Sequence, residues 1–220
     1  MSKILQNFLD FIWPQFCLGC KTEGALCCGF CLNDILLQEN NKISWPDKDK
    51  LYFEACYVCC DYHNKLLQKI IKNYKYSYLE NMADLLVDIL EKQSRRLSLP
   101  KNTIISNVPL HKRKRKIRGF DQTEILAKKL AQRLNLKYSP MLVRKRHTKA
   151  QARLSKEQRQ KNISNAFEIN KKDSLKNSKS PKKILLLDDV TTTGSTLNQA
   201  SKALKEAGYK NIFCLAIAKN

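Results

Sequence analysis

The stretch Ile184-Leu185-Leu186-Leu187-Asp188-Asp189-Val190-Thr191-Thr192-Thr193-Gly194-Ser195-Thr196 decides the fold of this chain. Four consecutive apolar residues predict a strand that is buried on both faces, as in a parallel sheet. Two carboxylates follow, then a hydroxyl-rich turn with one glycine, and then an expected helix from Ser195 to Ala207. Open α/β sheets bind ligands beyond the carboxyl ends of their strands. The stretch therefore predicts a ligand site directly after this strand.

The turn has the chemistry of a phosphate-binding loop. Backbone N–H groups at the start of a helix, the helix dipole and nearby hydroxyls all favour a bound phosphate. The residues that would form this cup are Thr192, Thr193, Gly194, Ser195 and Thr196. An ordinary strand-turn-helix with a Ser/Thr cap uses the same residue types and is the alternative.

Strand and helix patterns alternate along most of the chain. Apolar runs predict strands at 51–60, 103–108 and 212–218, and helical periodicity predicts helices at 64–74, 78–91 and 123–134. A long basic loop is expected between 108 and 123, and a mobile polar connection over 170–183. This alternation indicates an α/β fold with a parallel sheet and right-handed crossovers.

The formal net charge of +21 lies entirely in residues 101–220, because acidic and basic residues are equal in number in residues 1–100. Such a field attracts polyanions such as diphosphates or nucleic acid, although a solvated Lys-rich surface would give the same composition. The hydrophobic content of 43% excludes a disordered chain. The apolar segment 4–12 is much shorter than a membrane span and contains Asp10, so we expect a soluble intracellular protein.

Eight of the nine cysteines lie before residue 61. Two Cys-x2-Cys pairs, Cys17 with Cys20 and Cys28 with Cys31, can converge on one tetrahedral ion, and four thiolates favour structural zinc. Cys27 competes with Cys28 for the third position, but Cys28 gives the paired spacing. The alternative is a set of buried free thiols. Cys56, Cys59, Cys60 and Cys214 fall in strand patterns and are interpreted as small apolar strand residues.

A basic run follows the expected strand 103–108. It places six cations beside the same sheet edge as Asp188, where a Mg-diphosphate would need them: Lys112, Arg113, Lys114, Arg115, Lys116 and Arg118. A second basic stretch, 144–161, is either a lid over the ligand or a solvated helix face.

The stretch 184–196 resembles the phosphoribosyl-diphosphate (PRPP) signature of type I phosphoribosyltransferases. That resemblance implies that Asp188 and Asp189 contact the ribose hydroxyls, that Thr192 to Thr196 hold the 5′-phosphate, and that Mg²⁺ accompanies PRPP.

The likeness to the ComF family of competence-associated proteins covers nearly the whole chain. It rests on the four N-terminal cysteines, Val108-Pro109-Leu110, Arg118-Gly119-Phe120-Asp121-Gln122, then Gln151, Arg159, Asn162 and Phe167, and the PRPP loop. Asp121 replaces the Asn that is usual in this family, which leaves the contact at position 121 open.

The resemblance implies a zinc module over residues 1–45 and a phosphoribosyltransferase-like domain over 46–220. It implies a cytoplasmic PRPP-binding protein that acts in DNA uptake during natural transformation. Single-stranded DNA and competence helicase or recombination proteins are its candidate partners. The alternative is an active phosphoribosyltransferase with an unidentified acceptor, and no further catalytic arrangement can be argued from the residues.

Overall fold

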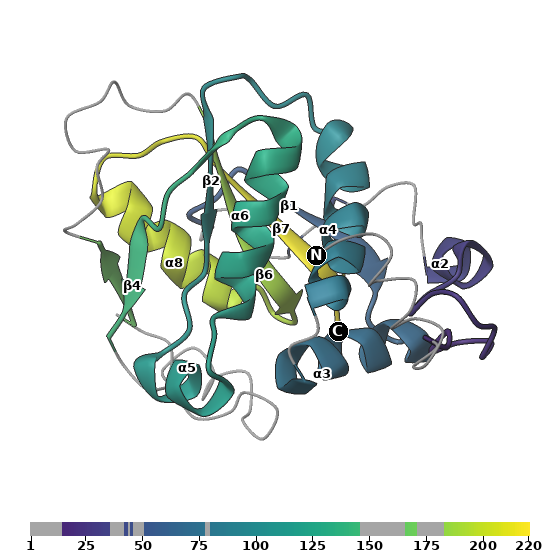
Figure 1. Ribbon diagram of the computed structural model, residues 1–220. Helices are drawn as coiled ribbons and strands as arrows, with labels where there is room; N and C mark the ends of the chain where they lie inside the picture. Colours follow the sequence, from purple (N-terminus) through teal and green to yellow (C-terminus); the bar gives the residue numbers. More distant parts are fainter. Residues whose placement is uncertain are drawn as a thin grey trace.

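A computed structural model describes residues 15–35, 42–43, 45, 51–77, 80–145, 166–170 and 183–220 (Figure 1). Its main sheet has five strands in the order β1-β7-β6-β2-β3. Their bounds are β1 Ala55–Asp61, β2 Thr103–Asn107, β3 Lys137–Tyr138, β6 Lys183–Thr191 and β7 Ile212–Lys219. Every neighbouring pair is parallel. The predicted parallel α/β fold is confirmed.

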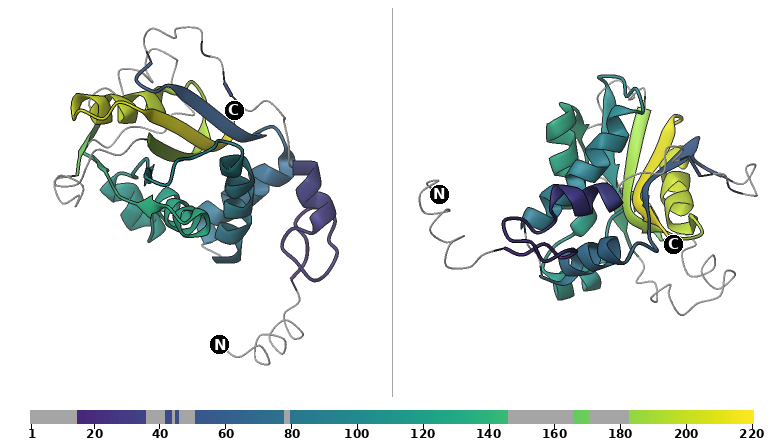
Figure 2. Two further views of the ribbon diagram at one scale, coloured as in Figure 1. Left: turned by 90° about the horizontal axis from the view of Figure 1, so that it is seen from above. Right: turned by 90° about the vertical axis from the view of Figure 1, so that its right-hand side faces the viewer.

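Helices cover both faces of the sheet (Figures 1 and 2). The helices α3 (Lys65–Ser77), α4 (Glu80–Arg95) and α6 (Gln122–Leu134) lie on one face, and α8 (Ser195–Glu206) lies on the other. Successive residues of β6 alternate between the two cores: Leu185 and Leu187 pack with the first, whereas Ile184 and Leu186 pack with the second. The apolar run is therefore buried on both faces, as its composition predicts.

A topological switch point lies between β2 and β6. The chain leaves β2 through α6 and reaches β3 on one side, whereas it leaves β6 through α8 and reaches β7 on the other side. Crossovers that diverge in this way leave a crevice at the carboxyl ends of the two strands, which is where open α/β sheets bind ligands. The carboxyl end of β6 carries Asp188 and Asp189.

Several element boundaries differ from the sequence predictions: β1 begins at Ala55 and not at residue 51, and α3 continues to Ser77. Strand β6 continues to Thr191, because its ladder with β7 runs on to the pair Thr191 and Lys219. Both aspartates are thus strand residues. Helix α4 continues to Arg95, whose guanidinium pairs with Glu91 one turn earlier at 2.6 Å.

The predicted basic loop after β2 contains a helix, α5 (Lys112–Arg118). The expectation of a loop came from six neighbouring cations without apolar periodicity. Caps at both ends account for the helix: His111 accepts a hydrogen bond from the Arg113 N–H, and Gly119, at φ 80°, donates to the Arg115 carbonyl.

A small antiparallel sheet, formed by β4 (Leu142–Arg144) and β5 (Phe167–Ile169), packs against α8. Strands of three residues are too short for alternation to reveal them, so the sequence did not predict this sheet. Most of the expected lid 144–161, most of the polar connection 170–183 and the apolar segment 4–12 lie outside the described residues.

The N-terminal segment packs on the first core. Its helix α2 (Gly29–Ile35) contributes the buried Ile35, and Leu18, Leu26 and Leu32 lie against the same cluster. The division into residues 1–45 and 46–220 stays a prediction. Within the described ranges, no helix combines the length and the apolar character needed to span a membrane.

Candidate functional site

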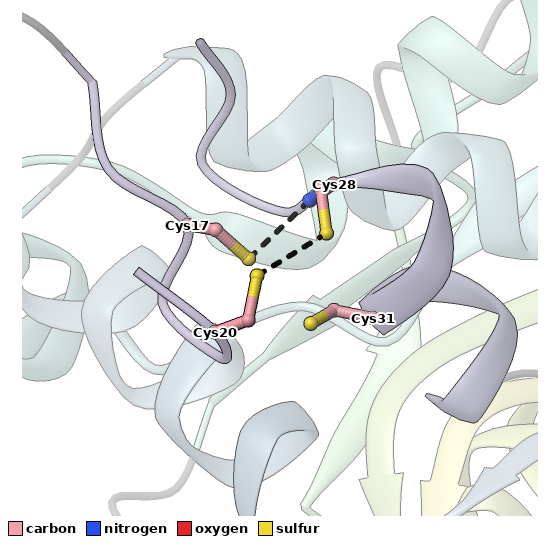
Figure 3. Close-up of side chains that lie close together, drawn as sticks. All are labelled: Cys17, Cys20, Cys28 and Cys31. Atoms are coloured by element: carbon pink, nitrogen blue, oxygen red, sulfur yellow. Dashed lines mark hydrogen bonds between the residues drawn. The ribbon is translucent and has the colours of Figure 1, made fainter. Parts of the chain in front are cut away.

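The four predicted cysteines form one cluster (Figure 3). The Sγ atoms of Cys17, Cys20, Cys28 and Cys31 all lie within 4.8 Å of one another, and those of Cys20 and Cys28 are 3.5 Å apart. Tetrahedral Zn–S bonds of about 2.3 Å place sulfurs roughly 3.8 Å apart, so the spacing fits a single ion with four thiolate ligands. The cluster is suited to hold a structural metal ion, and it includes Cys28 and not Cys27.

The local backbone suits thiolate ligands. Burial acts to raise the pKa of Cys17, but N–H groups of Cys28, Cys20 and Gly19 outweigh it and lower that pKa to about 6. The Cys28 N–H lies 3.4 Å from the Cys17 Sγ. Gly19 is required by space, because a Cβ there would lie 2.7 Å from the Cys31 Sγ. Cys27 instead points its thiol at the Cys28 carbonyl, and burial raises the pKa of Cys27 to about 11.

The remaining cysteines are strand residues, as predicted. Cys56, Cys59 and Cys60 lie in β1, Cys214 lies opposite Cys56 in β7, and all four are buried.

The aspartate pair lies at the switch point, and its two members have different surroundings. Burial raises the pKa of Asp188, and the neighbouring charge of Asp189 adds to that effect. Burial also acts against the charged form of Asp189, but Lys75, together with hydrogen bonds from Val190 and Gln122, outweighs it and lowers the pKa of Asp189. The Lys75 Nζ lies 2.7 Å from the Asp189 Oδ2. Asp189 is therefore held charged before any ligand arrives.

Asp189 also accepts two further hydrogen bonds. The Gln122 Nε2 donates to its Oδ2 at 3.1 Å, and the Val190 N–H donates to its Oδ1 at 2.6 Å. Sequence reasoning missed the role of Lys75, because a lysine near the end of an amphipathic helix carries no local signal of its partner. Gln122 belongs to the motif that starts at Arg118, so its place near the site could have been anticipated.

The predicted phosphate loop has the expected shape. Gly194 lies at φ 72° as the N-cap of α8 and offers no side chain to cap the first amides. Where the turn meets the helix, the Thr193 and Ser195 hydroxyls lie 2.6 Å apart. The backbone amides and the hydroxyls of this turn thus lie together at a helix N-terminus, the arrangement that binds anions.

Trp45 covers this loop from the N-terminal side. A Cβ on Gly194 would lie 2.7 Å from the Trp45 ring, so the indole and the loop backbone are in close contact. The Lys219 ammonium lies 5.5 Å from the centre of the same ring. Nearby, the Ile43 N–H donates to the Cys56 carbonyl of β1, which ties this part of the chain to the sheet edge.

The six predicted cations lie on the helix α5 and have different surroundings. Burial and the cations Arg144 and Arg118 lower the pKa of Lys114, and the charge of Asp189 opposes this effect. Arg115 pairs with Glu124 at 3.4 Å, and Arg118 lies 5.7 Å from the centre of the Tyr76 ring. Lys112, Arg113 and Lys116 are exposed.

Arg144 on β4 is a further cation near the site. Burial lowers its pKa, while the charges of Asp188 and Asp121 oppose that effect. The sequence left Arg144 in either a lid or a solvated helix face, whereas the structure places it in the strand β4, close enough for its charge to interact with Asp188.

Asp121 caps helix α6. Its Oδ1 accepts hydrogen bonds from the Glu124 N–H and the Thr123 hydroxyl, and its Oδ2 accepts from the Leu110 N–H at 2.7 Å. This residue is 4% exposed. The contact left open in the sequence is therefore an N-cap that also fastens the chain after β2.

Comparison with known proteins gives one family model and several curated relatives. Residues 123–220 match the family model described as phosphoribosyl transferase domain. The chain is 34% identical over 129 residues to Competence protein F of Haemophilus influenzae, an alignment that covers 58% of this chain and 54% of that protein. It is 30% identical over 158 residues to DNA utilization protein YhgH of Shigella flexneri, covering 68% of this chain and 66% of that protein.

A shorter match, 49% identical over 39 residues, is to Competence protein ComFC of Streptococcus pneumoniae, with 18% of each chain covered. Among solved structures, adenine phosphoribosyltransferase from Leishmania donovani aligns with a TM-score of 0.37 at 13% identity, covering 74% of this chain and 83% of that one. The matched part spans about half the length of the first of these curated relatives.

The parallel sheet, the acid pair at its switch point and the loop at the start of α8 define a phosphoribosyltransferase-like domain. With the cysteine cluster and the curated relatives, the chain belongs to the ComF family of phosphoribosyltransferase-like proteins.

Proposed function

We propose that this protein binds PRPP together with Mg²⁺ at the carboxyl end of β6 and acts in DNA uptake in the cytoplasm. The observation that carries the proposal is the buried pair Asp188 and Asp189 at the switch point, followed at once by a helix whose N-cap is Gly194. The names of the relatives, Competence protein F and DNA utilization protein YhgH, support the process.

Each part of the ligand has a complementary group in the chain. The 5′-phosphate would lie on the amides and hydroxyls of 192–196, and the ribose hydroxyls would donate to the carboxylates of Asp188 and Asp189. Besides Lys75, which is already paired with Asp189, the charges of Lys114 and Arg144 reach the acid pair, so the diphosphate would lie towards these two cations. Bound Mg²⁺ would offset the negative charge of the diphosphate, and oxygen ligands of the kind this site offers suit that ion.

Zinc is the ion we propose for the cysteine cluster. Four thiolates with tetrahedral spacing leave no open coordination position, so the ion would stabilise the fold and take no part in chemistry.

Calorimetry with PRPP and Mg²⁺ tests the proposed ligand site. Asp188→Asn with Asp189→Asn keeps the side-chain shape but removes two charges, so affinity should fall by one to several orders of magnitude. Asp84→Asn with Asp88→Asn is the matched control, because it removes two charges from α4, where both side chains are roughly half exposed. If the wild type does not bind PRPP, or both double variants bind it equally well, the proposal fails.

An active phosphoribosyltransferase is the second candidate function, favoured by the family model matched by residues 123–220. In that reaction, the bond between the anomeric carbon and the diphosphate breaks, the diphosphate leaves with the electron pair, and an acceptor forms the new bond. Cations beside the diphosphate would stabilise the charge that develops on it. Diphosphate release in the presence of a panel of bases and nucleotides distinguishes the two functions. Binding without release supports the ligand-binding role.

A further inference from the structure

The side-chain amide of Gln122 has a fixed orientation. Gln122 is the first residue of α6 and is 3% exposed. Its neighbour is the Asp189 Oδ2, 3.1 Å from the amide nitrogen. An ionised carboxylate only accepts hydrogen bonds, so the nitrogen must face Asp189 and the oxygen must point elsewhere.

The amide oxygen of Gln122 is a buried acceptor without a donor. Within the described ranges of the chain, no group donates a hydrogen bond to this Oε1. A buried polar atom that has lost its hydrogen bonds to water and gained none from the protein destabilises the folded state, and native structures contain few such atoms. A ligand that donates a hydrogen bond at this point would remove that cost.

Neighbouring contacts hold Gln122 in place. The Tyr74 hydroxyl donates to the Gln122 backbone carbonyl at 2.8 Å, and Tyr74 is 1% exposed. The next residue, Lys75, binds the same Asp189 oxygen as the Gln122 amide. Helix α3, the start of α6 and the end of β6 thus meet around one carboxylate. The amide cannot turn its oxygen towards another partner without losing its bond to Asp189.

We propose that the Oε1 of Gln122 accepts a hydrogen bond from a ribosyl hydroxyl, which makes Gln122 a ligand-binding and specificity-determining residue. This inference rests on the proposed phosphoribosyl site, because the acceptor lies beside the acid pair assigned to the ribose. Its chemistry requires an O–H donor. A ribose hydroxyl is one such donor, and a water molecule bound to Mg²⁺ is the other.

Selectivity between sugars follows from this acceptor. A site that is built to receive a hydroxyl rejects an analogue that lacks it, because the buried acceptor is then left unpaired. The site should therefore prefer ribose 5-phosphate to its 2-deoxy or 3-deoxy form. The carboxylates of Asp188 and Asp189 also favour ribose over its deoxy forms. The contribution of Gln122 is therefore measured as the decrease in this preference when the Gln122 amide is removed.

Calorimetry with ribose 5-phosphate and its two deoxy forms, all without divalent metal, measures that part. Gln122→Met keeps the length of the side chain and removes the acceptor. The preference of the wild type for ribose over at least one deoxy form should narrow by about tenfold in this variant. Gln132→Met is the control, because Gln132 is exposed on the same helix. If Gln122→Met does not fold, Gln122→Asn takes its place in the experiment, because it keeps an amide but shortens the side chain by one methylene and so moves the oxygen away from the ligand.

Three results would overturn the inference. An unchanged sugar preference in a folded Gln122→Met that still binds ribose 5-phosphate would refute the contact while leaving the ligand site intact. An effect confined to PRPP with Mg²⁺ would assign the Oε1 to a metal-bound water. A wild type that binds no phosphoribosyl compound would refute the proposed function and this inference together.

Discussion

The Lys75 ammonium, on α3, lies 2.7 Å from the carboxylate of Asp189, on β6. This ion pair contributes to a difference in pKa between the adjacent residues Asp188 and Asp189. Lys75 lowers the pKa of Asp189 against the effect of burial, whereas burial and the charge of Asp189 raise the pKa of Asp188. The carboxylate of Asp189 is thus held in its charged form, whereas Asp188 holds its proton more firmly than a free aspartate does.

Lys75→Met should destabilise the fold in a way that depends on pH. In the wild type the lowered pKa of Asp189 contributes stability above its unfolded pKa of about 3.9, and this stability is lost as the pH falls through the folded value. In the variant, burial is opposed only by the weaker hydrogen bonds from the Val190 N–H and the Gln122 amide, so charging Asp189 costs stability. Urea unfolding should show a loss of about 2–3 kcal/mol at pH 7 that shrinks towards pH 4.

Lys72→Met is the matched control, since Lys72 is exposed on the same helix. It should change the free energy of unfolding by less than about 0.5 kcal/mol at both pH values. An equal loss at pH 4 and pH 7 in Lys75→Met would contradict the role assigned to the ion pair.

Metal content should distinguish two neighbouring cysteines. Purified wild-type protein should contain one equivalent of zinc, and Cys20→Ser should lose it together with the fold of the N-terminal segment. Cys27→Ser should keep it, because Cys27 lies outside the four-sulfur cluster. Elemental analysis of the three proteins checks this, and a well-folded wild type without metal would refute the assignment.

Gly194→Ala should destabilise the protein through two separable effects. The left-handed backbone at φ 72° costs an alanine about 1 kcal/mol, and the Cβ must displace the Trp45 ring. Adding Trp45→Ala to the variant should relieve the crowding but not the backbone cost. The melting temperatures of the two single variants and the double variant form a double-mutant cycle that measures the coupling between the two positions. If the decreases in melting temperature are additive, Trp45 and Gly194 are not in contact in solution.

The exposed cations of α5 should set the salt dependence of binding to single-stranded DNA. Lys112→Gln, Arg113→Gln and Lys116→Gln together should flatten the slope of log K against log salt by about 0.7 for each phosphate that the variant no longer neutralises. The exposed Tyr76 and Ile117 give this surface apolar groups as well. Lys101, Lys137 and Lys210 are equally exposed elsewhere, and their Gln variants serve as the control. Equal slopes in both triple variants would exclude α5 from the DNA interface.

The local pattern was enough to predict the sheet and the loop after β6. A run of four apolar residues between polar flanks is typical of a strand that is buried on both faces. Once that strand is placed, the acids and the glycine that follow it must lie at its carboxyl end. The cysteine spacing likewise predicted which four sulfurs meet. These features are decided by residues close together in the sequence.

Features that depend on distant parts of the chain were missed. Lys75 and Asp189 are brought together by the packing of α3 beside the end of β6, and no local pattern links them. The helix α5 was missed for a local reason, because its caps at His111 and Gly119 outweigh the repulsion among its cations. The strands β4 and β5 exist because residues 142–144 and 167–169 pair across an intervening stretch.

The contact between Trp45 and Gly194 gives the protein a built-in optical reporter. The chain has two tryptophans, Trp13 and Trp45, so Trp13→Phe leaves a single indole, which lies against the loop assigned to the 5′-phosphate. Indole emission responds to nearby charge and to water. Arrival of a phosphate at the loop should therefore change the emission of Trp45, which would allow occupancy to be followed in real time without a labelled ligand.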